Sequence, residues 1–438
     1  MIIILGGGLT GLTSAYGLEK KKVEYLLLEK ENVLGGLCRS VEKNGFVFDY
    51  TGHFLHFHKN QDSVKSFVFS LLKNDLLRIH RNAKIYTKFS ETNNRLLPYP
   101  YQANIKFLSK KVRKNCLLQL LNSQLSLNTT KKIFNFKDFL IKNFGSGITK
   151  YFFKPYNEKI WREKLENITI SWAEKFVPIP DLEEILNSFL ERNLKDYGYN
   201  TYFYYPKTYG IQKLVEVIKS KLNKQKILTS CEVVKIDYKN KKIVFKHKNS
   251  LQTIKYDKLI STIPLPELLK ITNFSLKIKN VSDNLKYSSV LCFNIVLNEP
   301  VLKGIHWIYF PDSDIIFYRL GCYHNISKSL VLPNYGSLYV EVGFKKNQEY
   351  DENKIFNQVV KDLIKTKIIS SEKQIVFYDV LKIPYAYVIY DSYRDKIIPF
   401  ILRFLKKNDV YSIGRYGEWK YSYMSENIQD AMNTVNIL

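Results

Sequence analysis

Three glycines close to the N-terminus have the spacing of a turn that binds phosphate. Gly6, Gly8 and Gly11 follow the apolar run Ile2–Leu5, and Glu29 stands eighteen residues after the last of them. Without a Cβ, glycine lets the backbone approach a pyrophosphate, and the helix after such a turn adds N–H donors. An acid at the position of Glu29 accepts hydrogen bonds from an adenosine ribose. The spacing therefore predicts a dinucleotide-binding site.

The elements around these glycines must place them at the end of a strand for that chemistry to work. The sequence predicts a buried strand over 2–5, a helix over 10–18 and a second strand over 23–28. This context favours the dinucleotide site over a purely structural glycine turn, which is the alternative. A signal peptide is disfavoured, because no basic residues precede the apolar run and the glycines interrupt it.

Two further segments have residue types suited to a cofactor. They contain Gly36 and Arg39, and Gly52 and His53. A guanidinium beside a tight glycine turn is placed to reach phosphate oxygens, and small-residue loops at strand ends are where α/β sheets bind ligands.

Three nearby histidines raise the question of a metal site. His53, His56 and His58 have ligand-like spacing, but no cluster of cysteines or acids accompanies them. Alternation along an extended segment sends His53 and His56 to opposite faces. We therefore predict that the protein binds no metal here.

Composition narrows the class of protein and its partners. Hydrophobic residues make up 45% of the 438 residues, yet no apolar stretch reaches the ~18 residues that span a bilayer. The five cysteines lack CxxC spacing, which favours a reducing, cytoplasmic location. The net charge of +26 is spread along the chain, and the compact basic run 110–114 is typical of a solvated helix face. We expect no integral membrane segment and no nucleic-acid partner, and leave an oligomer open.

The apolar pattern divides the chain into α/β stretches and two insertions. Helical spacing dominates 104–200, including a helix predicted over 179–194, and strand-like alternation dominates 277–378. A hairpin is predicted to turn at Lys239–Asn240 and a last helix to cover 425–438. The predicted domains are a discontinuous dinucleotide-binding domain (1–103, 201–266 and 405–438), a helical substrate domain (104–200) and an antiparallel sheet domain (267–404).

Longer motifs give the chain a family resemblance. The N-terminal turn, the GGxxRS segment and the C-terminal Gly-Arg resemble the FAD-containing amine oxidase and protoporphyrinogen oxidase superfamily. Six motifs resemble those of UDP-galactopyranose mutases, especially eukaryotic-type ones: FDYTGH (48–53), PYPYQAN (98–104), PYNEKIW (155–161), WIYFP (307–311), FYR (317–319) and GRYGEWKY (414–421). The resemblance implies an α/β chain, with a Rossmann-like FAD-binding domain, a helical insertion and an antiparallel β-sheet domain.

The resemblance also implies a reaction. Family members interconvert pyranose and furanose forms of a nucleotide-hexose, with N5 of the reduced FAD acting as nucleophile at the anomeric carbon. The implied substrate is a UDP-hexose, the reductant can be NAD(P)H, and the product serves cell-surface polysaccharide biosynthesis. The net reaction is an isomerisation.

Site residues are carried over from the motifs. The implied catalytic residues are His53, Arg319, Lys175, Tyr309 and Tyr421. The implied substrate-binding residues are Tyr99, Tyr101, Gln102, Asn157, Trp161, Tyr309, Arg319 and Tyr421. The implied cofactor-binding residues are Gly6, Gly8, Thr10, Gly11, Glu29, Gly36, Arg39, Gly52, His53, Val233, Gly414 and Arg415.

Two departures leave the substrate open. Lys175 stands where the family has a second phosphate-binding arginine, and lysine lacks the bidentate fork. The chain ends at Leu438, without the longer C-terminal segment of eukaryotic-type members. Two other functions remain: an FAD-dependent oxidoreductase of the amine oxidase or protoporphyrinogen oxidase type, and a non-catalytic binding protein. Arg319, Lys175 and the tyrosines disfavour the first, and the intact glycine turn disfavours the second.

Overall fold

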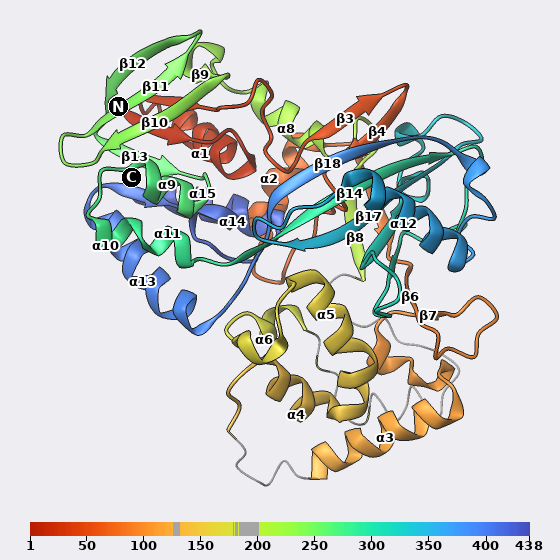
Figure 1. Cartoon of the computed structure of the whole chain (residues 1–438). Coiled ribbons are helices and arrows are strands. Elements are labelled where there is room, and N and C mark those ends of the chain that lie inside the picture. The colour runs from red at the N-terminus through yellow and green to blue at the C-terminus, as the bar shows by residue number, and fades with distance from the viewer. Residues whose placement is uncertain (126–131, 178, 180–182, 184–200) are drawn as a thin grey trace.

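The computed structural model describes residues 1–125, 132–177, 179, 183 and 201–438. A parallel sheet that carries both chain termini and a larger, mainly antiparallel sheet lie side by side, and a helical region lies below them (Figure 1). Three hydrophobic clusters join these parts.

The parallel sheet is assembled from three separate stretches of chain. Its strand order is β19-β13-β1-β2-β9, and every pair is parallel. The bounds are β1 Ile2–Leu5, β2 Tyr25–Leu28, β9 Ile227–Leu228, β13 Lys258–Ser261 and β19 Val410–Ser412. All of β1 is buried, as the continuous apolar run IIIL predicts for a central strand covered on both faces.

Helices and a three-stranded sheet pack around this parallel sheet, and two smaller sheets lie between it and the larger sheet (Figure 1). Helix α1 (Leu9–Lys20) packs against α15 (Met424–Ile437), where a Cβ on Gly17 would lie 3.0 Å from Val435. The other helices are α2 Asp62–Leu72, α8 Gln212–Lys219, α9 Leu265–Ile271, α10 Leu276–Lys279, α11 Val281–Asn284, α13 Ser392–Lys407 and α14 Gly414–Gly417. The small antiparallel sheets are β3 Ser40–Lys43 with β4 Phe46–Asp49, β5 Leu76–His80 with β8 Tyr202–Pro206, and β10 Cys231–Asp237 with β11 Lys242–His247 and β12 Ser250–Lys255.

The seven-stranded sheet is the largest sheet among the described residues. Its order is β18-β14-β17-β16-β15-β6-β7, antiparallel except between β15 and β6. The bounds are β6 Ala83–Tyr86, β7 Leu96–Pro98, β14 Tyr287–Leu297, β15 Trp307–Tyr309, β16 Arg319–Cys322, β17 Gly336–Lys345 and β18 Ile375–Val388. One face is apolar and packs under α12 (Glu352–Lys365). Alternation then sends every second side chain to the opposite face, which is free to carry polar groups.

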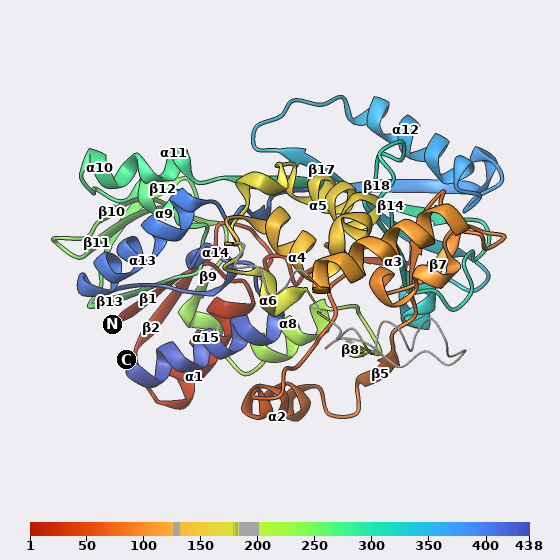
Figure 2. The same cartoon turned by 90° about the horizontal axis from the view of Figure 1, so that it is seen from below.

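The helical region lies against the seven-stranded sheet, where α5 contacts β14 and β17 (Figure 2). It contains α3 Lys110–Leu125, α4 Phe136–Ile148, a π-helix over Thr149–Phe153, α5 Lys154–Trp161 and α6 Ala173–Phe176. Two glycines of α4 let α3 approach closely, since a Cβ on Gly147 would lie 2.8 Å from the Cα of Cys116. Helix α5 leads directly out of the π-helix and faces the strand ends of the seven-stranded sheet.

The α/β fold with a helical and a mainly antiparallel part confirms the predicted fold class. The predicted hairpin is formed by β10 and β11, and the predicted last helix is α15. Strands β6 and β7 lie within the predicted first segment, 1–103, but pair in the seven-stranded sheet. The domain boundaries remain predictions. The helix predicted over 179–194 falls almost entirely outside the described residues.

Candidate active site

The glycine turn has a gap that the protein's own atoms do not fill. A Cβ on Gly8 would have only the Cα of Gly36 within 4 Å, at 3.9 Å, and Gly8 has an ordinary φ of −73°. By contrast, a Cβ on Gly11 would lie 2.0 Å from the carbonyl oxygen of Gly6. Gly11 is therefore required by the packing of α1 on β1, whereas nothing in the fold requires Gly8. The gap at Gly8 is what a pyrophosphate needs.

Glu29 is held at the end of β2 by the same turn. Its Oε2 accepts the N–H of Gly7 at 2.6 Å, its Oε1 accepts the N–H of Glu31 at 2.9 Å, and the residue is 8% exposed. Each carboxylate oxygen keeps a further lone pair for a ribose hydroxyl. The predicted cofactor residue Val233 is two residues after Cys231. The N–H of Cys231 donates to the Glu29 carbonyl at 2.8 Å, so this part of β10 lies beside the end of β2.

A second glycine loop lies directly opposite the first. Gly8 and Gly35 form a parallel bridge, and a Cβ on Gly36 would lie 3.2 Å from the Cα of Gly8. Arg39 is folded over this loop, with its Nε donating to the Gly36 carbonyl at 2.9 Å and its guanidinium 4.8 Å from the ring centre of Tyr50. The two loops make a narrow cradle without side chains.

The pair Gly414–Arg415 packs against α1 at the predicted cofactor site. Gly414 has a φ of +78°, and a Cβ there would lie 2.5 Å from Oγ1 of Thr10 on α1. The Arg415 guanidinium donates to the carbonyls of Ser422 (2.9 Å) and Ala386 (2.7 Å) and lies 4.8 Å from the ring centre of Tyr421. Arg415 thus joins the predicted cofactor site to the substrate side.

His53 lies between the predicted cofactor site and the seven-stranded sheet. Burial, with a further contribution from the Arg415 charge, lowers the pKa of His53 to about 4. The preceding residue, Gly52, is needed for space, since a Cβ there would lie 2.5 Å from the Tyr339 hydroxyl. The imidazole is therefore neutral at physiological pH and held against the seven-stranded sheet.

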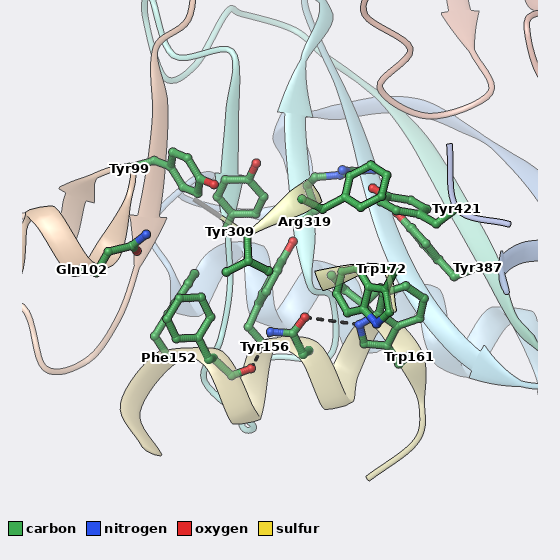
Figure 3. A pocket seen from close by; sticks show the side chains of 15 residues that line it. Tyr99, Gln102, Phe152, Tyr156, Trp161, Trp172, Tyr309, Arg319, Tyr387 and Tyr421 are labelled. Carbon is green, nitrogen blue, oxygen red and sulfur yellow. Dashed lines mark hydrogen bonds between the residues drawn. The ribbon is translucent and has the colours of Figure 1, made fainter. Parts of the chain in front are cut away.

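A pocket opens where this sheet meets α5 (Figure 3). Its lining residues are Tyr99, Gln102, Phe152, Phe153, Tyr156, Asn157, Ile160, Trp161, Trp172, Phe176, Val177, Tyr309, Arg319, Tyr387 and Tyr421. The pocket brings together seven residues predicted for substrate binding: Tyr99, Gln102, Asn157, Trp161, Tyr309, Arg319 and Tyr421. Its walls are mainly aromatic, and Arg319 is the cation among the described residues that line it.

Strand register fixes the position of Arg319. Tyr309, Arg319 and Glu341 are directly opposite one another on β15, β16 and β17, so they share one face of the sheet. Glu341 is fully buried and accepts Nε of Arg319 at 2.5 Å and Nη2 at 2.8 Å. This bidentate pair uses one edge of the guanidinium. The other edge, which includes Nη1, remains to face the pocket.

Tyrosines flank Arg319 on both sides. The Tyr309 ring lies 5.1 Å from that of Tyr99 and 5.3 Å from that of Tyr156. Burial raises the pKa of Tyr309 and raises that of Tyr421 to about 12. Both hydroxyls therefore keep their protons at physiological pH and are able to donate to an anion.

Helix α5 supplies the facing wall. Asn157 donates through Nδ2 to the Phe153 carbonyl at 2.8 Å and accepts Nε1 of Trp161 at 3.2 Å. Trp161 in turn lies 4.9 Å from Trp172 and 6.0 Å from Tyr421 between ring centres. These contacts fix the α5 side chains before any ligand binds.

The predicted substrate-binding residue Tyr101 and the predicted catalytic residues Lys175 and His53 do not line the pocket. Tyr101 is fully buried and stacks on the far side of Phe152, with 4.8 Å between ring centres. The short 3₁₀ turn Tyr101–Ala103 aims its ring into the helical core, so Phe152 and not Tyr101 faces the pocket. Lys175 is half-exposed and forms an ion pair with Glu426 at the start of α15. The next residue, Phe176, is the one that reaches the pocket.

Several lining residues were missed by sequence reasoning. Tyr387 lies on β18 with its ring 5.8 Å from that of Tyr421, and Tyr156 directly precedes the predicted residue Asn157 in the PYNEKIW motif. The alternation of the PYAYV stretch over 384–388 marks a strand, but alternation alone does not say which face meets the site.

Comparison with known proteins identifies the family. The sequence matches the family described as "Flavin containing amine oxidoreductase" over residues 9–411. The chain belongs to this family. The cofactor is therefore a flavin, and the cradle at Gly8, with Glu29 beyond it, fits the pyrophosphate and ribose of FAD.

Individual relatives show which known proteins this chain is similar to. A crystal structure of reduced UDP-galactopyranose mutase superimposes with a TM-score of 0.91 at 27% identity, covering 99% of this chain and 93% of that one. The UDP-galactopyranose mutase of Mycoplasma genitalium is 26% identical over 165 residues, 36% of this chain and 39% of that protein. An uncharacterized protein from the nifH2 3′ region of Methanothermococcus thermolithotrophicus is 48% identical over 52 residues, 12% of this chain. The matched segments span only 39% of the length of the Mycoplasma genitalium protein and 50% of the length of the Methanothermococcus thermolithotrophicus protein.

Neither a membrane-spanning helix nor a metal-binding group of side chains is present among the described residues. No helix there is long and apolar enough to cross a membrane. No group of three or more His, Cys, Asp or Glu side chains in the same residues is arranged to hold a metal ion.

The gap at Gly8 generates the first prediction. In the Gly8→Val protein a branched side chain occupies the pyrophosphate position without meeting other protein atoms at Cβ. We expect folded, colourless protein, measured by flavin absorbance and circular dichroism. Gly11→Ala is the contrasting variant, because its Cβ collides with the Gly6 backbone and should lower stability by ~1–3 kcal/mol. Full flavin occupancy in the Gly8→Val protein would show that Gly8 does not contact the pyrophosphate.

The buried ion pair generates the second prediction. Glu341→Ala leaves the Arg319 guanidinium without its partner, so the free energy of unfolding should fall by about 3 kcal/mol, the lower end for breaking a buried pair, because Arg319 also faces the pocket. Chemical denaturation of the flavin-loaded protein measures this. The control is Glu352→Gln, which removes a surface pair with Lys382 and should cost much less. Equal losses in the two variants would contradict the assignment.

Proposed function

We propose that the protein is a flavin-dependent mutase that interconverts the pyranose and furanose forms of a nucleotide-hexose, with a UDP-hexose as substrate. The observation that carries the proposal is the pocket edge of the Arg319 guanidinium, flanked by the protonated tyrosines Tyr309 and Tyr421. This set of donors suits a diphosphate. The overall likeness to a reduced UDP-galactopyranose mutase supports the same substrate class.

In the proposed reaction the protein mainly positions its ligands. A bound flavin in its reduced form supplies a nucleophilic nitrogen for the anomeric carbon of the sugar. Arg319 stabilises the negative charge that grows on the diphosphate as its bond to that carbon breaks. Tyr309 and Tyr421 donate hydroxyl hydrogen bonds to the same phosphates. Holding the diphosphate in place lets it return to the sugar after the ring has changed size.

The neutral His53 suits this chemistry. With a pKa of about 4, its imidazole adds no positive charge beside the sugar, where positive charge develops as the diphosphate leaves. The aromatic walls of the pocket exclude water, which would otherwise hydrolyse the activated sugar.

The base is proposed to bind at the end of the pocket formed by Tyr99, Gln102 and Asn157. Gln102 is 2% exposed, so its amide contacts are made in a site shielded from water. A flat aromatic such as Tyr99, whose other face carries the Arg81 guanidinium at 4.8 Å, offers a stacking surface for a pyrimidine.

An FAD-dependent oxidoreductase is the alternative function, favoured by the family match itself. A hydride donor such as an amine requires an apolar pocket next to the flavin. The buried Glu341, which orients Arg319 toward the pocket, has no role in that chemistry.

The third prediction separates these functions. Dithionite-reduced protein, kept without oxygen and given UDP-galactopyranose, should form the furanose over many turnovers from one reduction, because the electrons return to the flavin in each cycle. Chromatography of the nucleotide-sugars measures the product, and flavin-free Gly8→Val protein is the control. Consumption of one reductant per product would support the oxidoreductase instead.

The fourth prediction concerns the two cations of the predicted phosphate site. Arg319→Lys keeps a positive charge beside Glu341 but removes the second guanidinium edge, so UDP affinity should fall about 10- to 100-fold with unchanged flavin content. Lys175→Ala should have a smaller effect, because Lys175 pairs with Glu426 and does not line the pocket. Titration of UDP followed by protein fluorescence measures both. An Arg319→Lys protein that binds UDP as the parent does would return Arg319 to a structural role.

A further inference from the structure

Lys159 is a charged residue of the PYNEKIW motif that has no assigned function. It lies on α5 between Asn157 and Trp161, which both line the pocket. Its ammonium donates to three backbone carbonyls, those of Phe310 (2.8 Å), Asp312 (3.1 Å) and Phe317 (2.7 Å). The three donors of the ammonium thus have three acceptors.

These carbonyls belong to the turn between β15 and β16. Strand β15 ends at Tyr309, immediately before Phe310, and β16 begins at Arg319, two residues after Phe317. The turn is closed by a hydrogen bond from the N–H of Phe310 to the carbonyl of Tyr318 at 2.9 Å. Lys159 therefore holds the turn that joins the strands of Tyr309 and Arg319, two of the side chains proposed to bind phosphate.

The backbone of Lys159 is fastened to the same sheet. A Cβ on Gly343 of β17 would lie 2.6 Å from the Lys159 carbonyl oxygen, so the glycine lets α5 rest against this strand. Lys159 thus lies close to β17 through its main chain and holds the β15–β16 hairpin through its side chain. Figure 3 shows the two walls that meet there, with Tyr156 and Trp161 on α5 facing Tyr309 and Arg319.

A lysine at this position is costly for the fold. Burial lowers the pKa of Lys159 to about 7, although the nearby carboxylates of Asp312, Asp362 and Asp314 favour the charged form and the Arg162 charge opposes it. An apolar side chain would avoid that cost but would not fix the direction of three carbonyls.

We propose that Lys159 is a positioning residue that sets the distance between the two walls of the substrate pocket. It fixes the α5 wall, with Asn157 and Trp161, relative to the strand wall, with Tyr309 and Arg319. The inference rests on the proposed function, because it requires a nucleotide diphosphate that contacts both walls. Flavin binding, which uses the glycine cradle, does not depend on it.

The fifth prediction tests this role with UDP titrations of the flavin-loaded protein. Lys159→Met should weaken UDP binding at least 10-fold at pH 7 with unchanged flavin absorbance. The matched control is Lys154→Met on the same helix, whose ammonium pairs only with Glu158 at the surface among the contacts described, and which should stay within about twofold of the parent. Hydrogen exchange of the amides at 310–318 should quicken in Lys159→Met without UDP, and not in the control.

A pH series on the parent gives a readout that does not depend on how the variant folds. Between pH 7 and 9 the UDP phosphates are already ionised, while Lys159 passes from ammonium to amine, so UDP affinity should fall as pH rises. In Lys159→Met the profile should be flat. A flat profile in the parent, or a Lys159→Met protein that binds UDP like the Lys154→Met control, overturns the inference alone. A parent that binds no UDP overturns the proposed function and the inference together.

Discussion

The ion pair between Arg319 and Glu341 is the interaction on which the substrate side depends. A carboxylate without solvent exposure is tolerated only when it is paired, and here two hydrogen bonds pair it with one edge of a guanidinium. The pair is close to neutral as a whole. The ion pair therefore presents fixed N–H donors to the pocket more than a bare positive charge. Such donors select ligands by their shape as well as by the sign of their charge.

The seven-stranded sheet makes this arrangement possible by separating its two faces. Leu320 and Val340 belong to the apolar face under α12, while Arg319 and Glu341, one residue away on the same strands, belong to the other. The polar face then meets the loop that carries His53, and Arg415 extends the contact to the cofactor cradle. The hydrophobic cluster under α12 and the site thus lie on opposite faces of one set of strands.

The sequence predicted those features that depend on residues near one another in the chain. The glycine turn, β2 and Glu29 lie within thirty residues, and the hairpin of β10 and β11 depends on one turn. Features set by long-range register escaped prediction. The pairing of Arg319 with Glu341 requires two strands to align, and Lys175 meets Glu426 from a distant helix, so its charge is not left for a phosphate. Tyr101 shows the same limit, because a 3₁₀ turn, and not the motif, decides which aromatic ring faces the pocket.

The order of strands in the parallel sheet has a consequence for how the protein is made. Central strand β1 is translated first, but its neighbour β13 comes from 258–261, and β19, which pairs with β13, comes from 410–412. At about 5–20 residues per second, a ribosome needs on the order of tens of seconds to add β19 and the Gly414–Arg415 pair behind it. During that time the nascent chain exposes a half-built sheet and a cradle that lacks one wall. We therefore expect stable flavin binding only after β19 and the Gly414–Arg415 pair have been added.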